Sequence, residues 1–429
     1  MTSDGPGEPA RLRLRGWRDP QVVALALLAM SAGFGQFGVV AALGDVARSF
    51  GHLQSGASIA DQAGLSGTKL GAGLAIIRLA SLGGLPLAGV ADRFGRRRTL
   101  IAACSLGLAL TVVSAASPGY WWFVIIFALG RPMLSATNAL AGVSAAEETS
   151  SADRAKAIAL IAAGYGIGTG LVAFLHGLVG GQLGFRGLVA LAVVPLALMP
   201  LLARRVEEPD RFARQAIAAE HRLPVLSAIA PQFRRRLAVV SVITFALSVI
   251  TGPANSFVYL YAENVLHVKG YVTSAMVAAA GVTGFGGLLL GRYLADHLGR
   301  RPTAAIAMSA MAVLGVLTYS GTTIAVLVGY VLGVLAASTI APAAGSFVNE
   351  LFPTSVRASV AGWQVASGVL GASVGLLAFG AIADVGNRFG VAAATTFLPA
   401  LSGLLLLIVL PETRGRELED LWPEMGSVA

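Results

Sequence analysis

Long apolar runs follow one another along almost the whole chain, and they restrict the possible folds more than any other feature. Each run holds about 20 residues, the length that a helix needs to cross a bilayer, and charged residues gather in the gaps. A helix satisfies its backbone hydrogen bonds internally, as lipid requires. The sequence predicts twelve helical spans, at 21–43, 70–91, 99–116, 121–146, 157–181, 187–202, 238–262, 272–295, 303–320, 324–349, 358–383 and 391–410.

The composition excludes a soluble enzyme, because only 12% of the residues are charged, against roughly 25% in soluble domains. The single cysteine, Cys104, lies inside an apolar run, so neither a disulfide nor a cysteine-based metal site is expected. No Walker-type nucleotide motif, ring-forming filter or array of voltage-sensing arginines is visible. The chain is therefore predicted to be neither an ATP-driven pump nor a channel, and to use no cofactor.

The net charge of +9 arises from basic clusters in short gaps beside the spans rather than from a soluble domain, so nucleic acid is not an expected partner. With alternating spans these gaps share one side, which the positive-inside bias identifies as the cytoplasm. We expect a multi-pass protein of the cytoplasmic membrane with both termini inside the cell. Its predicted parts are a tail at 1–20, a bundle at 21–202, a linker at 203–236, a second bundle at 237–410 and a tail at 411–429.

Three pairs of landmarks indicate that the second half repeats the first. The segment DRFGRRRT at 92–99 recurs as DHLGRRPT at 296–303, an offset of 204 residues. Glu147 recurs as Glu350 at an offset of 203, and Glu208 recurs as Glu412 at 204. Because an even number of spans separates equivalent points, both copies share one orientation, which is a parallel repeat. The expected fold is an all-α membrane protein in which two six-helix bundles rock about a central site.

At these residues the chain resembles the major facilitator superfamily, whose signature loop between the second and third spans is similar to GVADRFGRRR at 89–98. Two further segments resemble the sugar porter and metabolite symporter branch: NELFPTSVR at 349–357 after the tenth span, and PETRGR at 411–416 after the twelfth. EPDRF at 208–212 is a weaker version of the motif after the sixth span. The resemblance implies a twelve-helix transporter that works by alternating access.

The spans also depart from the patterns of that superfamily. The paired glutamines of sugar porters are absent from the seventh span, which runs SVITGPAN at 248–255, and the first span has Gln36 and Phe37 near the place where many proton-coupled members carry an acid. The Gly-Pro signature of drug antiporters is absent from the fifth span, where the glycine-rich run 164–170 is interpreted as helix packing. The matched motifs therefore lie in the loops and not at the substrate site.

The matched loop residues predict a gate. Gly89 is expected to let two helices approach closely, and Asp92 to accept hydrogen bonds or cap a neighbouring helix. Four arginines are expected to pair with the repeated glutamates and to latch the cytoplasmic side: Arg96, Arg97, Arg154 and Arg357 with Glu147, Glu208, Glu350 and Glu412. Alternatively, all are solvated loop charges worth about 0–1 kcal/mol a pair. The candidate gating residues are Gly89, Asp92, Arg93, Gly95, Arg96, Arg97, Glu147, Arg154, Glu208, Asp296, Gly299, Arg300, Arg301, Glu350, Arg357 and Glu412.

Inside the spans, Arg131 is the sharpest candidate for substrate binding. It lies about ten residues, or about 15 Å, into the fourth span, where a charge is costly unless it is paired or hydrated, and Gly130-Arg131 resembles a pair found in this span across the superfamily. Arg78 and Gln36 lie at comparable depths. Two arginines favour an anionic substrate, such as an organic or aromatic carboxylate. The alternatives are a snorkelling or structural Arg131, and an Arg78 paired with Asp45 or Asp61.

Five residues of the second half are expected to form the opposing wall of this site: Asn255, Tyr259 and Tyr261 in the seventh span, and Trp363 and Gln364 in the eleventh. For the aromatic residues among them, the alternative is ordinary packing or interfacial anchoring. Tyr165 and Thr169 on the fifth span are weaker candidates.

The function predicted is secondary transport of a small organic solute, preferably a carboxylate-bearing metabolite, by a proton-coupled monomer in the bilayer. No proton carrier is identified, because the candidates Asp45, His176, Glu263 and Asp384 all lie near outer span ends. The alternatives are a drug or metabolite efflux antiporter and a membrane receptor of the same fold that does not transport.

Overall fold

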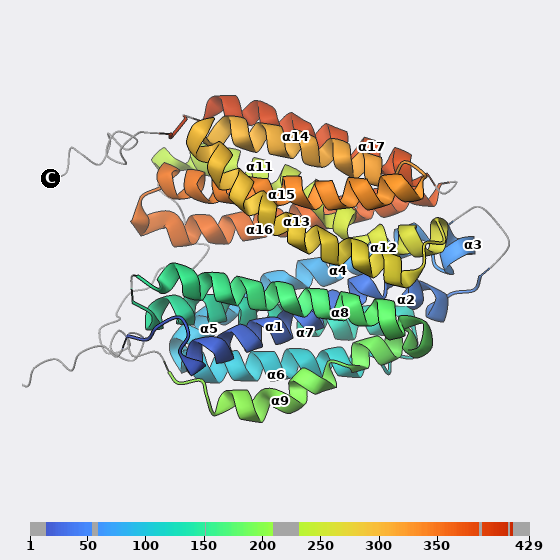
Figure 1. Cartoon of the computed structure of the whole chain (residues 1–429), viewed down its shortest axis with the longest axis horizontal. Coiled ribbons are helices and arrows are strands. Elements are labelled where there is room, and N and C mark those ends of the chain that lie inside the picture. The colour runs from blue at the N-terminus through green and yellow to red at the C-terminus, as the bar shows by residue number, and fades with distance from the viewer. Residues whose placement is uncertain are drawn as a thin grey trace, which may run out of the picture.

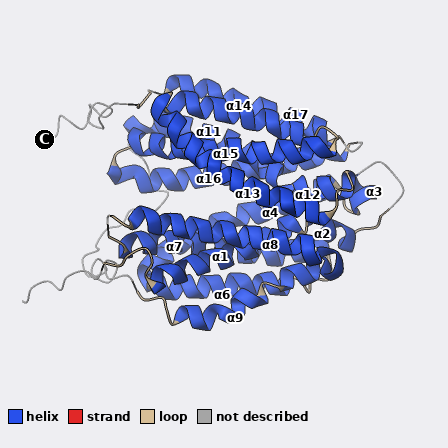
Figure 2. Cartoon of the chain, in the orientation of Figure 1, coloured by secondary structure: helices blue, strands red, loops and turns tan. Residues whose placement is uncertain are grey.

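The computed structural model describes residues 14–53, 59–150, 152–208, 231–385, 388–410 and 412–414, and their regular elements are helices that form two bundles (Figures 1 and 2). The N-terminal bundle consists of α1 (Pro20–Ala41), α2 (Leu43–Phe50), α3 (Ile59–Ala63), α4 (Gly67–Ala80), the 3-10 turn η1 (Ser81–Gly83), α5 (Gly84–Phe94), α6 (Arg96–Ser114), α7 (Tyr120–Glu148), α8 (Arg154–Ala190) and α9 (Val193–Ala203). The C-terminal bundle consists of α11 (Pro231–Ser256), α12 (Val258–Leu260), the π-helical turn η2 (Tyr261–Val265), α13 (Gly270–His297), α14 (Arg300–Thr318), α15 (Thr323–Leu351), α16 (Thr354–Asp384), α17 (Phe389–Ala400) and the 3-10 helix η3 (Leu401–Val409).

Eleven helical segments in the described part are long and apolar enough to cross a membrane. One of them, Arg154–Ala203, is 50 residues long, and its backbone leaves the helical conformation at Gly184, where φ is 57°. That break separates the predicted fifth span from the sixth, so the structure agrees with twelve spans. Glycine tolerates this left-handed φ because it has no Cβ atom.

Two predicted boundaries change. The second span is divided by η1 into α4 and α5. The seventh span begins at Pro231, inside the predicted linker, because proline is well suited to the first helical turn, where its missing N–H has no partner to lose. Residues 209–230, the rest of that linker, lie outside the described residues, as do residues 1–13 and 415–429 of the predicted tails.

Glycines bring helices into backbone contact in both bundles. A Cβ atom added at Gly164 or Gly168 of α8 would collide with a backbone carbonyl of α1, and one added at Gly371 or Gly375 of α16 would collide with a carbonyl of α11. Such approach maximises van der Waals contact, which membrane helices rely on because lipid supplies no hydrophobic drive between them. The predicted packing role of the glycine-rich run 164–170 is confirmed at these two positions.

The two bundles meet along two seams that the repeat relates to each other. In one seam α4 packs on α16, where Gly71 approaches the carbonyl of Leu376; in the other α8 packs on α13, where the Ser274 hydroxyl donates to the carbonyl of Ala173 at 2.7 Å. Figure 1 shows α8 and α13 lying side by side. We call the end where Arg96, Arg300 and both described termini lie the arginine-rich end, and the other the opposite end.

We predict that Gly168→Leu destabilises the N-terminal bundle by about 1–3 kcal/mol, because overpacking forces α1 and α8 apart. Thermal unfolding of the purified protein in detergent measures the effect. Gly170→Leu is the matched control, since a Cβ at Gly170 meets no atom within 4 Å. Equal loss of stability in both variants would contradict the glycine seam.

Candidate functional site

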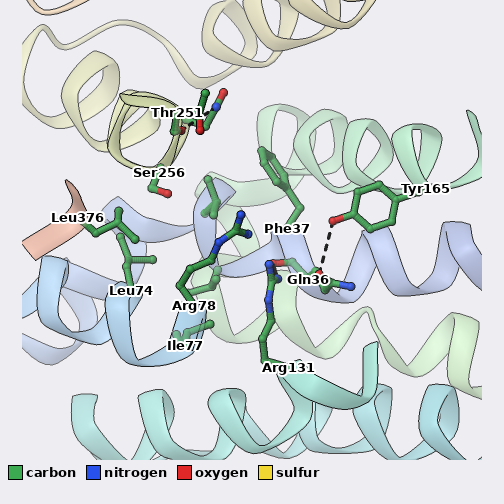
Figure 3. Close-up of a pocket in the computed structure, with 14 residues that line it drawn as sticks. Gln36, Phe37, Leu74, Ile77, Arg78, Arg131, Tyr165, Thr251, Ser256 and Leu376 are labelled. Atoms are coloured by element: carbon green, nitrogen blue, oxygen red, sulfur yellow. Dashed lines mark hydrogen bonds between the residues drawn. The ribbon is translucent and has the colours of Figure 1, made fainter. Parts of the chain in front are cut away.

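A cavity of about 210 Å³ lies at mid-depth between the bundles (Figure 3). Helices α1, α4, α7 and α8 form one wall, and α11 and α16 form the other. Its apolar lining includes Phe37, Leu74, Ile77 and Leu376. Its polar lining consists of Gln36, Arg78, Arg131, Tyr165, Thr251, Asn255 and Ser256.

Arg131 is held in the cavity wall by α7 and anchored to α1. Its Nη1 donates to the backbone carbonyl of Gln36 at 3.2 Å, while its Nε is buried without a hydrogen-bond partner among the described residues. The Gln36 side chain accepts a long hydrogen bond from the Tyr165 hydroxyl at 3.5 Å, and its Nε2 is also buried and unpartnered. Two unused donors at one place suit a ligand with acceptor oxygens.

Arg78, in the last turn of α4, reaches the same cavity, and Figure 3 shows its guanidinium group and that of Arg131 on the same side of Phe37. Neither arginine forms an ion pair with an acid in the part of the chain that the structure describes. The alternative pairing of Arg78 with Asp45 is wrong, because Asp45 pairs with Arg48 and lies against His176. The cavity therefore carries two positive charges that no described carboxylate balances.

Of the five residues predicted for the opposing wall, the structure brings only Asn255 to the cavity. Its side chain donates to the carbonyl of Thr251 at 2.9 Å and accepts from the Tyr330 hydroxyl at 3.2 Å. Tyr259 is buried outside this lining, with its ring against Phe37 and His176. The spacing of four residues from Asn255 does not keep Tyr259 on the same face because α11 ends at Ser256.

Gln364 is placed in a different, smaller cavity inside the C-terminal bundle, beside Arg300. At 100° a residue, it lies about 120° around α16 from the cavity residue Leu376, so one straight helix cannot present both to the same space. The prediction that Gln364 lines the same site as Arg131 and Asn255 is therefore wrong. Three other candidates do not line the cavity either. Thr169 donates a hydrogen bond to a carbonyl of its own helix, the Tyr261 hydroxyl accepts from the N–H of Gly321, and Trp363 is exposed.

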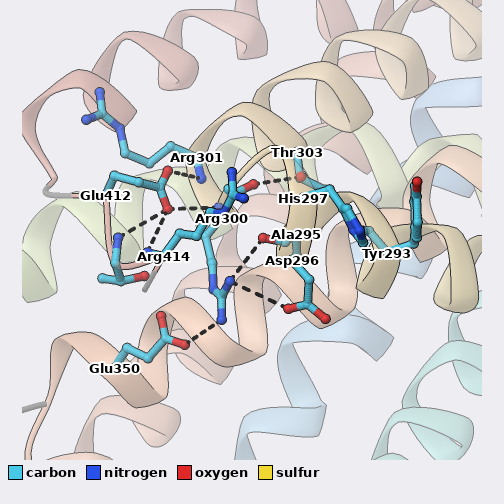
Figure 4. Close-up of polar contacts among 12 residues, drawn as sticks. Tyr293, Ala295, Asp296, His297, Arg300, Arg301, Thr303, Glu350, Glu412 and Arg414 are labelled. Carbon is cyan, nitrogen blue, oxygen red and sulfur yellow. Dashed lines mark hydrogen bonds and ion pairs between the residues drawn. The ribbon is translucent and has the colours of Figure 1, made fainter. Parts of the chain in front are cut away.

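At the arginine-rich end, one carboxylate caps an equivalent helix in each bundle. Glu208 accepts from the backbone N–H groups of Arg96 and Arg97 at the start of α6. Glu412 accepts from those of Arg300, at 2.9 Å, and Arg301, at 3.0 Å, at the start of α14 (Figure 4). The first N–H groups of a helix lack internal partners and carry partial positive charge, so a carboxylate is stabilised there.

The repeated glycines make these caps possible. Gly95 and Gly299 precede the two helices with φ of 97° and 107°, a conformation that other residues rarely adopt. A Cβ at either position would lie 3.0 Å from the capping carboxylate. Burial disfavours the charged form of Glu412, but four backbone N–H groups outweigh it and hold the pKa of Glu412 below its ordinary value.

Of the arginines predicted to pair with a glutamate at this end, Arg96 is confirmed, and Arg300 forms an equivalent pair that was not predicted. Arg96 pairs with Glu147, and Arg300 pairs with Glu350 at 3.1 Å and with Asp296 at 3.6 Å (Figure 4). Each of these pairs joins residues of one bundle. They fasten helices within a bundle and do not bridge the two, so their gating role remains a prediction.

Three further arginines at this end donate hydrogen bonds from their side chains to backbone carbonyls at helix ends: Arg97, Arg154 and Arg357. Arg154 Nε donates to the carbonyl of Ala146 at 3.0 Å near the end of α7, and Arg357 Nε to that of Phe352 at 2.9 Å just after α15. The Arg97 side chain donates to two carbonyls at and beyond the end of α9. These carbonyls lack internal partners, and arginine supplies the donors.

Three candidate gating residues of the signature loop make no contact in the described part of the chain that would support a gate. The expected close approach at Gly89 is wrong for this conformation, because a Cβ there would meet no atom within 4 Å. Arg93 is exposed. The side chain of Asp92 lies outside the described residues, so the hydrogen bonds or cap expected of it stay a prediction.

Polar contacts at the opposite end, which sequence reasoning left unassigned, join the bundles directly. Asp384 of α16 accepts from the backbone N–H of Gly67 and the hydroxyl of Thr68 at the start of α4, both at 2.9 Å. His176 of α8 lies 3.1 Å from both carboxylate oxygens of Glu263 in η2. The sequence marks these residues as ionisable groups near span ends, but contains no signal that they face each other.

A second unforeseen contact ties the start of the chain to the N-terminal bundle. Arg15 pairs with Asp19 at 3.2 Å and with Glu207, and the Gln21 side chain donates to the buried Glu148 at 2.6 Å. The segment before α1 is therefore fastened to the end of α7 and to the segment after α9. In the sequence these residues contribute only to the charge bias.

We predict that Glu412→Gln lowers the free energy of unfolding at pH 7 by about 0.3–1 kcal/mol, the usual worth of a charge at a helix N-terminus. Because the pKa of Glu412 is lowered in the folded state, its stabilisation is present above its unfolded pKa and is lost as the pH falls through the lowered value. The difference between the two proteins should therefore shrink in acid, as thermal unfolding at several pH values would measure.

The control is Asp296→Asn, which removes an equal charge from a side chain that is 56% exposed beside the same helix. It should change stability by less than about 0.5 kcal/mol. A larger effect of Asp296→Asn than of Glu412→Gln would argue against the cap.

Comparisons with known proteins agree with this architecture. The sequence matches two family profiles, "Major Facilitator Superfamily" over residues 25–294 and "Sugar (and other) transporter" over residues 215–424. It is 26% identical to a "Probable 4-methylmuconolactone transporter" of Cupriavidus pinatubonensis, over 83% of this chain and 85% of that protein. It is 25% identical to a "Gallate transporter" of Pseudomonas putida, over 78% and 82% of the two chains.

Two solved structures share the fold. The nucleoside transporter NupG superimposes with a TM-score of 0.71 at 15% identity, covering 91% of this chain and 98% of that one. The xylose transporter XylE of E. coli, in an inward open conformation, superimposes with a TM-score of 0.67 at 22% identity, covering 94% and 98%. At these identities the likeness establishes the fold alone.

Proposed function

The chain belongs to the Major Facilitator Superfamily, and from that premise we propose that its substrate is a small organic anion bound through a carboxylate by Arg78 and Arg131. It is a multi-pass membrane protein that transports a small solute and is not an enzyme. The proposal adds the chemical class of the solute and the residues that bind it.

The unbalanced charge of the central cavity supports this proposal. Two guanidinium groups line it and form no ion pair with a described acid, and charges inside a membrane protein are costly unless they are paired or hydrated. A carboxylate would balance part of this charge. Arginine also presents its donors in a planar fork that matches carboxylate geometry.

The size of the cavity and the named relatives fit the same class. A volume of about 210 Å³ falls below the range of roughly 300–1,000 Å³ that is typical of drug-sized ligands. One relative is named for gallate, which is a carboxylate, and another for a methylmuconolactone. The apolar side chains around the arginines suit a ring or short hydrocarbon chain beside the carboxylate.

Alternating access would follow from rocking of the two bundles about this cavity. In this structure the contacts between the bundles lie toward the opposite end. Parting them would connect the cavity to the side of the membrane that this end faces. The positive-inside bias assigns the arginine-rich end to the cytoplasm. We propose a monomer in the cytoplasmic membrane whose transport is coupled to protons.

Counterflow in liposomes tests the substrate class. We expect vesicles loaded with unlabelled benzoate or gallate to exchange labelled benzoate or gallate, while the neutral benzamide is exchanged at least tenfold more slowly because it offers no charge to the arginines. Equal exchange of benzoate and benzamide would refute the carboxylate site. Binding of the acids without any exchange would favour the receptor alternative.

The two arginines are tested separately. Arg131→Gln and Arg78→Gln should each lower the apparent affinity for benzoate by at least tenfold, since a charge-assisted hydrogen bond is lost. Arg292→Gln, which removes an equal charge from an exposed position on α13, is the matched control and should leave the affinity unchanged. Wild-type affinity in both cavity variants would place the substrate elsewhere.

Proton coupling is tested by imposing pH gradients of both signs on the same vesicles. A symporter should accumulate benzoate when the outside is acidic, and an antiporter when the inside is acidic. Protein-free vesicles under the same gradients measure the passive entry of uncharged benzoic acid, which must be subtracted. Accumulation that is independent of the gradient would show that transport is not coupled to protons.

A further inference from the structure

A buried histidine joins the two bundles at the opposite end. His176 of α8 is 6% exposed, and its Nε2 lies 3.1 Å from both oxygens of Glu263, which belongs to the other bundle. Its Nδ1 lies 3.7 Å from Asp45 Oδ2 on α2. A Cβ at Gly180, one turn further along α8, would lie 2.8 Å from Nδ1, so glycine leaves room for the ring.

The hydrogen-bonding groups around the ring suit a protonated imidazole. A neutral histidine has one N–H group, so with Nε2 donating to Glu263 its Nδ1 would present a lone pair to Asp45. Nδ1 and Asp45 Oδ2 are both buried and neither has a hydrogen-bond partner among the described residues. A histidine with two N–H groups satisfies the first carboxylate and attracts the second.

The net charge of the groups around His176 also favours a protonated imidazole. The ionisable groups that face His176 are Asp45 and Arg48 on α2, Glu263 in η2 and Tyr259 on α12, whereas α13 contributes the neutral Ser274. With a neutral histidine, the two largely buried carboxylates and Arg48, whose side chain is 41% exposed, leave a net charge of −1 around the buried ring. With a protonated histidine the net charge is zero, which low-polarity surroundings favour.

We propose that His176 is the proton-binding residue of a latch between the bundles, so that closing the opposite end binds one proton. Protonated His176 bridges Asp45 of its own bundle and Glu263 of the other bundle, and opening this end separates it from Glu263 and releases the proton to solvent. This assignment names a residue for the proton coupling in the proposed function. The latch itself does not depend on that coupling, but its role in transport rests on the proposed function.

The second seam supplies a contrast that makes the latch testable. There Asp384 accepts from an amide and a hydroxyl, donors that do not titrate near neutral pH. Both seams must part when this end opens. Among the described residues, only the α8 side of the interface has a histidine in contact with carboxylates from two elements, Asp45 on α2 and Glu263 in η2. The pH response of closure should therefore depend on His176 and not on Asp384.

Distances between the bundles at this end measure closure directly. Spin labels are placed at Trp122→Cys and Ile324→Cys, exposed positions on the first turns of α7 and α15, in a Cys104→Ala background. We expect the ratio of closed to open protein to rise as the pH falls from 8.5 to 5.5. If closure binds one proton, the ratio of closed to open protein can change by at most about tenfold per pH unit.

His176→Gln should abolish this pH response, and Glu263→Gln should weaken it, because the neutral amide still accepts a hydrogen bond but carries no charge. Asp384→Asn should reduce the closed fraction at every pH while keeping the response. His267→Asn is the matched control: His267 is an exposed histidine at the same end with a φ of 54°, which asparagine tolerates, and its response should match the wild type.

A pH response of wild-type size in His176→Gln, its loss in His267→Asn, or its absence from the wild type would overturn the latch. The measurement contains no solute, so its outcome does not depend on whether the substrate is a carboxylate. Conversely, failure of benzoate counterflow would leave the distance measurement unaffected.

Discussion

A bilayer offers no hydrogen-bond partner to a backbone N–H or C=O group, and the rest of this structure depends on that constraint. Within a helix these groups bond to one another, so only the first N–H groups and the last C=O groups, at the helix ends, still need partners. At the arginine-rich end Glu208 and Glu412 accept from the first N–H groups of α6 and α14. Arginine side chains donate to the carbonyls where α7 and α15 finish. The repeated charges of the loops are thus first of all helix terminators, and each set belongs to one bundle.

The molecule divides into two units, and close backbone contact holds the helices of each unit together. Glycines at α1–α8 and at α11–α16 remove the side chains that would hold the helices apart. Between bundles, α4–α16 and α8–α13 meet along seams whose polar contacts lie toward the opposite end, where Asp384 and Ser274 each donate or accept across the boundary. Rigid bundles joined by a few breakable contacts are the arrangement that alternating access requires.

Both bundles contribute side chains to the central cavity, but the charged ones come from the N-terminal bundle. The N-terminal bundle supplies Arg78 and Arg131, and the C-terminal bundle supplies Asn255 and the apolar Leu376. Sequence reasoning found the arginines because a charge deep in an apolar run is conspicuous. It misplaced Tyr259 and Gln364, because a break after Ser256 and the rotation of α16 decide which way these side chains face.

The sequence by itself determined the twelve spans, the parallel repeat and the depth of the two arginines, since each follows from local hydropathy, spacing or offset along the chain. Only the tertiary structure decided which carboxylate caps which helix, that Arg96 and Arg300 each pair with a glutamate of their own bundle, and that His176 meets Glu263 across the boundary. These facts depend on the relative rotation and register of helices distant in sequence. Side-chain packing sets both, and no periodicity in a single chain encodes them.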